Sequence, residues 1–213
     1  MTRPSPGVAG VSAIAGGIVW AVGAAGWLLS HGSQPNVNTA AILGLTGTQF
    51  TQLLILATLL WVVALAGSVP GRRAARAAWV VGLAGVVMIG VGALFETTLV
   101  DPVANFTHPI VQSGWLLFIG GLFPVLFAGM LSLAAASRAG GAERWACTAI
   151  GASAPLPVVA FFIGEIAHEG AGGVAITALL HAAPGLAFVV FGLARRGARV
   201  ARDLAVADDL ALA

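Results

Sequence analysis

The stretch AAWVVGLAGVVMIGVGALFETTL, residues 77–99, contains no charged side chain except Glu96. A helix rises about 1.5 Å per residue, so a run of this length crosses the hydrocarbon core of a bilayer, which is roughly 30 Å thick. Comparable apolar runs occupy residues 8–30, 50–69, 110–135, 146–166 and 174–193. They lack the alternating polarity of a barrel strand, and lipid offers no partner to unpaired backbone groups. We therefore predict an all-α, polytopic membrane protein with six transmembrane helices.

The composition supports this class and excludes several others. Of the 213 residues, 59% are hydrophobic and 8% are charged, and the mean hydropathy is +0.98, far from the pattern of soluble domains. The net charge of +2 gives no reason to expect a nucleic-acid partner. Cys147 is the only cysteine, which excludes an internal disulfide and a multi-thiolate metal site. The bias toward Ala, Gly and Arg, without lysine or tyrosine, is typical of a GC-rich bacterium.

The arginines indicate the orientation in the membrane. All ten basic residues are arginines, at positions 3, 72, 73, 76, 138, 144, 195, 196, 199 and 202. The intervening loops, 31–49, 100–109 and 167–173, contain none. By the positive-inside rule, both termini are cytoplasmic and the helices form three antiparallel hairpins in the cytoplasmic (inner) membrane of a bacterium. Residues 1–194 form the six-helix transmembrane domain, and 195–213 form a cytoplasmic tail, basic and then acidic, that contacts anionic lipid.

Small residues predict which helix faces are buried, because close backbone approach drives helix association in lipid. At about 100° per residue, Glu96 shares an arc of its helix with three glycines, and His181 shares an arc with small residues of the last span. Those small residues are Gly82, Gly85 and Gly92 in the first case, and Thr177, Ala178, Gly185 and Gly192 in the second. Two sets of prolines should distort helices: Pro184 bends the last span, while Pro155 and Pro157 break the fifth.

The ionisable residues expected on the outer side suggest a site. They include all four histidines and four of the eight carboxylates: His31, Glu96, Asp101, His108, Glu165, His168, Glu169 and His181. Ionisable groups at membrane depth are costly and suggest function. A glutamate at a low-dielectric rim holds its proton more readily and can donate it, and a histidine can accept it. We expect an enzyme or binding protein for a lipophilic small molecule, with Glu96, His181, Glu165 and His168 as the catalytic residues.

Other functions remain open on the sequence alone. Glu165 and His168 form an ExxH pair like those of di-iron bundle proteins, although that pattern requires two such pairs and this chain has one. A mononuclear metal site or a haem held by histidines is a further hypothesis, as is a proton-coupled transporter of small solutes that uses the broken fifth span. The simplest alternative is that these residues are solvated at helix ends. The residues identify no cofactor, metal, substrate or oligomeric state.

Overall fold

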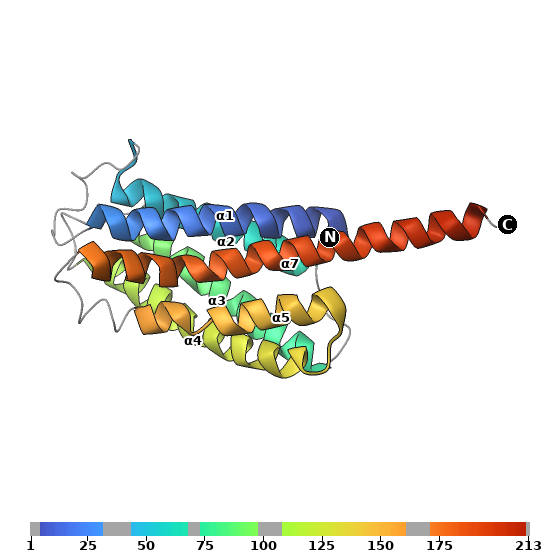
Figure 1. The fold of residues 1–213 in the computed structure, drawn as a ribbon. Helices are drawn as coiled ribbons and strands as arrows, with labels where there is room; N and C mark the ends of the chain where they lie inside the picture. The colour runs from blue at the N-terminus through green and yellow to red at the C-terminus, as the bar shows by residue number, and fades with distance from the viewer. Residues whose placement is uncertain (1–4, 32–43, 68–72, 98–107, 161–170, 212–213) are drawn as a thin grey trace.

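The structure is a computed structural model that describes residues 5–31, 44–67, 73–97, 108–160 and 171–211 (Figure 1). Within these ranges every regular element is a helix and no strand is present. This confirms the predicted all-α class for the described part of the chain. The elements are α1 (Pro6–His31), α2 (Gly47–Ala66), α3 (Arg73–Thr97), α4 (Pro109–Ala136), α5 (Gly141–Ser153) and α7 (Ala171–Ala211).

Five helices of the described part are long and apolar enough to cross a membrane, namely α1, α2, α3, α4 and α7. The chain is therefore a multi-pass membrane protein. The predicted span at 146–166 is only partly covered, because α5 ends at Ser153 and residues 161–166 lie outside the described ranges. α7 continues without interruption to Ala211, so the predicted tail begins inside the same helix as the last span.

Local chemistry explains where several helices begin and end. α2 starts with a capping box, in which Thr46 Oγ1 accepts from the Gln49 backbone N–H at 3.4 Å and Gln49 Oε1 accepts from the Thr46 N–H at 2.8 Å. α5 ends where prediction placed a break: Pro155 and Pro157 have no N–H to continue the helical ladder. Helical residues resume at 156–160, directly after this interruption.

The six helices pack as a closed ring in chain order. α1 packs against α2, α2 against α3, α3 against α4, and α4 against α5. α7 then closes the ring by packing against both α5 and α1. In Figure 1, α1, α2 and α7 form the upper part of the bundle, and α3, α4 and α5 form the lower part. Neighbouring helices in the ring are thus neighbours in sequence, except at the closing contact between α1 and α7.

The closing contact depends on glycines that face each other. A Cβ added to Gly17 would overlap the carbonyl oxygen of Gly185, and one added to Gly185 would overlap that of Gly17. One heptad away, a Cβ on Gly192 would lie 2.6 Å from the Gly10 oxygen. The backbones of α1 and α7 therefore touch at two levels seven residues apart, as expected for helices that associate in lipid.

The contact between α3 and α4 repeats this arrangement. A Cβ on Gly85 would lie 2.7 Å from the Gly121 oxygen, and one on Gly121 would lie 2.7 Å from the Gly85 oxygen. Seven residues further on, a Cβ on Gly92 would lie 2.6 Å from the Gly114 oxygen. The predicted small-residue arc of α3 is therefore the face that packs against α4.

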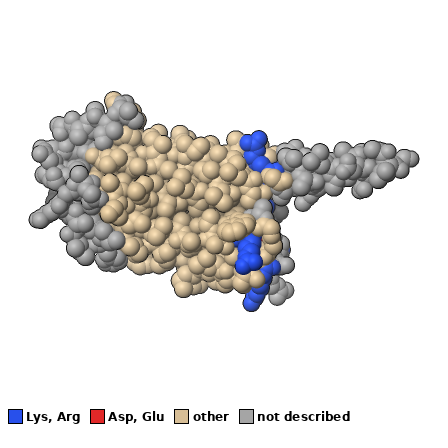
Figure 2. Space-filling view, in the orientation of Figure 1, with Lys and Arg blue, Asp and Glu red and all other residues tan. Residues whose placement is uncertain are grey.

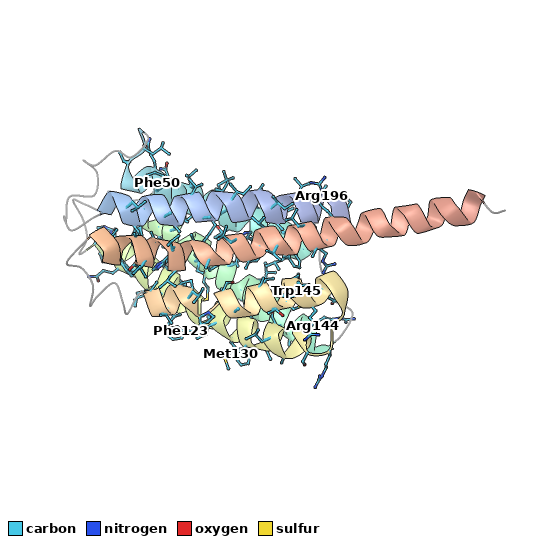
Figure 3. The ribbon with its side chains drawn as sticks, in the orientation of Figure 1. Phe50, Phe123, Met130, Arg144, Trp145 and Arg196 are labelled. Carbon is cyan, nitrogen blue, oxygen red and sulfur yellow. The ribbon has the colours of Figure 1, made fainter. Side chains whose placement is uncertain are left out.

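The outer surface of the ring is apolar, as a lipid environment requires. On α4, Phe123 and Met130 are each 61% exposed and point away from the bundle (Figure 3). The arginines with described side chains gather at one end, which we call the arginine end (Figure 2). They are Arg76, Arg138, Arg144, Arg195 and Arg196, and all are exposed. α1 begins at this end and α7 leaves the bundle there (Figure 1). We call the opposite end of the bundle, where α1 ends and α2 begins, the loop end.

Candidate functional site

The four predicted catalytic residues differ in how far the structure describes them. His181 lies in α7 with a described side chain, and Glu96 lies in the last turn of α3, with only its backbone described. Glu165 and His168 lie outside the described residues, as do Glu169 and Asp101. The geometry of the candidate site can therefore be built from His181 outward.

The ring of His181 is held by its own helix. Its Nδ1 lies 3.0 Å from the carbonyl oxygen of Thr177, one turn earlier in α7. A carbonyl oxygen can only accept, so the neutral imidazole carries its proton on Nδ1. Its Nε2 is then unprotonated. The lone pair on this nitrogen can take a proton or bind another group that accepts an electron pair. The side chain is half-buried.

Helix α1 fixes the position of this turn of α7. The Trp20 indole Nε1 donates to the His181 carbonyl oxygen at 2.9 Å. Pro184, three residues later, has no N–H and so deprives the Leu180 carbonyl of its usual helical donor. The glycine contact between Gly17 and Gly185 lies immediately beside this region. The turn that presents His181 is thus held to α1 by both a hydrogen bond and direct backbone contact.

A column of aromatic rings fills the interior from this level toward the arginine end. Trp20 stacks on Trp61 with ring centroids 4.7 Å apart, and Trp61 stacks on Phe188 at 4.1 Å. Phe188 meets Phe191 edge to face at 6.1 Å, and the Arg195 guanidinium carbon lies 5.2 Å from the centre of the Phe191 ring. These rings separate the level of His181 from the arginine end.

Sequence reasoning missed this column, although a signal for it exists. Tryptophan in membrane proteins concentrates at the interfaces, whereas Trp20 and Trp61 stand inside their spans. Both are almost completely buried. The Trp61 Nε1 is a buried donor with no hydrogen-bond partner in the described structure, and it sits against Gly16, where a Cβ would be 3.1 Å away. Tryptophans in mid-span therefore indicate the packed interior of the bundle.

Helix contacts relate the height of Glu96 to that of His181. The relevant contacts are Gly17 with Gly185, Gly23 with Leu54, and Gly90 with Thr58. Counting along the helices from these contacts places His181 about level with Gly92 of α3. Glu96 is one turn beyond Gly92, about 6 Å closer to the loop end at 1.5 Å per residue. α3 and α7 occupy opposite positions in the ring and are not packed neighbours. The glycine arc that predicted the position of Glu96 packs against α4, so the structure does not bring Glu96 and His181 together.

His108 marks the loop end of α4. It is the N-cap residue of that helix, and its Nδ1 accepts from the Ile110 backbone N–H at 3.2 Å. A ring nitrogen that accepts from an N–H is unprotonated, so neutral His108 carries its proton on Nε2. His108 and His181 are therefore opposite tautomers. The capping bond gives His108 a structural role, in agreement with the helix-end alternative for this residue.

The metal and haem hypotheses are not tested by the described residues. No group of three His, Cys, Asp or Glu side chains converges within the described ranges. The ExxH pair of Glu165 and His168 falls outside those ranges, and His31 is described only as the last residue of α1. Both hypotheses stay predictions from the sequence.

Comparisons of this chain with protein families, with curated proteins and with solved structures find no match. The proposals below depend on the sequence and on the geometry of these helices.

Proposed function

We propose that this protein is an enzyme or binding protein for a lipophilic small molecule, with acid and base chemistry at the loop end of the bundle. It has six transmembrane spans in three hairpins, and both termini lie in the cytoplasm of a bacterium. The fifth span comprises α5 and the residues after it up to about 166. His181, Glu96, Glu165 and His168 form the site, which opens toward the outer face of the membrane.

The distribution of arginine supports this orientation. The described arginines gather at the arginine end (Figure 2). Among them Arg76 lies in α3, Arg138 in the turn after α4, and Arg144 in α5, and all three are exposed. Short loops rich in arginine are retained on the cytoplasmic side, so the arginine end is the inner one. The ends of α1 and α3, and the start of α4, then face outward. Glu96 and His108 lie at that outward end.

The observation that carries the proposal is the hydrogen bond from His181 Nδ1 to the Thr177 oxygen. It fixes the tautomer and leaves Nε2 as the basic nitrogen of a half-buried ring. When Nε2 takes a proton from a ligand hydroxyl or other acid, the Thr177 carbonyl still accepts from Nδ1–H and stabilises the imidazolium. Glu96 lies about one turn nearer the outer face. Its carboxyl group would exchange a further proton with the ligand, as the second member of an acid and base pair.

The surroundings of His181 favour a lipophilic ligand. Ala178 and Ala182 beside it in α7 are buried, and the aromatic column begins at the same level with Trp20. These neighbours are apolar, so a ligand at His181 would meet few polar groups, the usual character of a small-molecule site. A ligand would therefore place its single polar group at His181 and its apolar body among the helices.

Extraction of the purified protein tests this function. Organic extracts of wild type and of two variants are compared by untargeted mass spectrometry. His181→Asn keeps a donor for the Thr177 carbonyl and lacks Nε2, while His181→Gln places an amide near the position of Nε2. We expect a lipophilic compound that co-purifies with wild type, is lost from His181→Asn and is partly retained by His181→Gln.

Thr177→Val is the matched control for this experiment. It removes a hydroxyl from the same turn and keeps the carbonyl that orients the ring, so the compound should be retained. Equal compound content in wild type and His181→Asn would contradict the proposal.

Transport is a second candidate, favoured by the interruption of the helix between Ser153 and residues 156–160. Broken helices commonly form substrate sites in transporters. The Ser153 hydroxyl donates to the Ile150 carbonyl at 3.1 Å, so this side chain is already occupied. Cysteines placed along α5 and α7 test the candidate. A transport path requires reaction with impermeant probes from both sides of the membrane, and reaction from one side only would exclude it.

A further inference from the structure

The first two turns of α5 form a groove at the arginine end. The groove has a volume of about 460 Å³ and is lined by Gly141, Arg144, Trp145 and Thr148. These residues recur at spacings of three and four, so they form one stripe along the helix. Figure 3 labels Arg144 and Trp145 on this part of α5. The groove is distinct from the candidate site around His181, which lies on the other side of the aromatic column.

The two largest side chains of the groove are available to a ligand. Arg144 is exposed, and its guanidinium has no ion-pair partner within the described residues. Trp145 is 71% exposed, and its indole N–H likewise has no acceptor in that part of the structure. An arginine beside an exposed tryptophan is the combination found where a membrane protein meets lipid headgroups.

The start of α5 leaves room for a headgroup. A Cβ added at Gly140 or Gly141 would meet nothing within 4 Å, so the approach to the start of α5 is open. The Thr148 hydroxyl donates to the Arg144 carbonyl at 2.8 Å, so it is bonded within its own helix. The carboxylate residue next to Arg144 in the sequence, Glu143, lies about 100° around α5 from it and outside the stripe.

We propose that this groove binds an anionic phospholipid, such as phosphatidylglycerol. The phosphate pairs with the Arg144 guanidinium. The Trp145 indole lies at the level of the ester groups, where its N–H donates to an ester carbonyl. Charge complementarity and the position at the arginine end point to a lipid of the adjoining leaflet as the occupant.

Titration of the full-length protein in neutral detergent tests this proposal, with lipid binding measured by native mass spectrometry. Arg144→Gln should weaken phosphatidylglycerol binding at least about tenfold, the effect of losing a charge-assisted hydrogen bond. Arg144→Lys should restore part of the affinity. Trp145→Phe, which removes only the indole N–H donor and one ring, should cause a smaller loss.

Arg76→Gln is the matched control, because Arg76 is an exposed arginine at the same end on a helix that does not line the groove. One charge near an anionic surface contributes about 1 kcal/mol, so its loss weakens binding no more than about fivefold. Equal losses in Arg76→Gln and Arg144→Gln would overturn the proposal. So would equal binding of phosphatidylcholine, or binding of soluble glycerol phosphate as tight as that of the lipid.

Discussion

Replacement of Gly185 by alanine should weaken the contact that closes the ring. The new Cβ would overlap the Gly17 carbonyl oxygen and lie 2.9 Å from the Ala21 nitrogen and 3.1 Å from Trp20 Cδ1. Two of these three atoms belong to the backbone of α1, so no side chain can rotate to make room. α1 and α7 must move apart by several tenths of an ångström or more along their whole contact.

The expected cost follows from two losses. Overpacking of a tight interface typically costs about 1–3 kcal/mol. Separation of the helices also stretches the 2.9 Å bond from Trp20 to the His181 carbonyl, and a hydrogen bond contributes about 1 kcal/mol. We therefore expect Gly185→Ala to lower the free energy of unfolding by about 2–4 kcal/mol, which corresponds to a fall in Tm of roughly 5–15 °C for a chain of this size.

Thermal unfolding in detergent, followed by circular dichroism, measures this effect. Gly197→Ala is the matched control, since Gly197 lies in the same helix and a Cβ there would meet nothing within 4 Å. That control should leave the Tm unchanged or raise it slightly, because alanine favours helix more than glycine does. Equal Tm values for the two variants would refute the direct backbone contact between α1 and α7.

Three further predictions concern other parts of the bundle. Gly92→Ala should lower the free energy of unfolding by about 1–3 kcal/mol in the same assay, because its Cβ would lie 2.6 Å from the Gly114 oxygen. Gly120→Ala should be tolerated, because the new Cβ meets only the flexible end of Met88. Trp20→Phe keeps an aromatic ring and loses the donor to His181, so the Tm should fall by a few degrees for a loss of about 1 kcal/mol. In a Cys147→Ser background, Gln112→Cys should react with an impermeant thiol reagent added outside cells, and Ser137→Cys should react only after permeabilisation. The reverse pattern of labelling would contradict the proposed orientation.

Much of the fold could be predicted because the bilayer constrains it strongly. The apolar runs predicted at 8–30 and 110–135 correspond to α1 and α4 within a few residues at each end. The break near Pro155 followed from the missing proline N–H groups, and the packing faces of α3 followed from its glycine arc. These features depend on local chemistry or on helical periodicity, both of which are visible in one sequence.

Other features require three dimensions. The pairing of α1 with α7 joins segments at opposite ends of the chain, and glycine spacing alone cannot say which helices meet. The tautomer of His181 depends on the distance to the Thr177 carbonyl, and its level relative to Glu96 depends on contacts through two other helices. The arc argument identified His181 as a residue beside small neighbours, but it gave no sign of the aromatic column that begins at the same level.

Nitrogen-15 NMR of the protein labelled at histidine, in lipid nanodiscs, tests the central claim most directly. The signals of His181 are identified by their loss in His181→Asn, and those of His108 by a corresponding variant. The account predicts that His181 carries its proton on Nδ1 with a bare Nε2, while His108 shows the opposite tautomer. A His181 ring that is protonated on Nε2 and bare on Nδ1 would contradict the account, because the nitrogen assigned to the ligand would then be unable to act as a base.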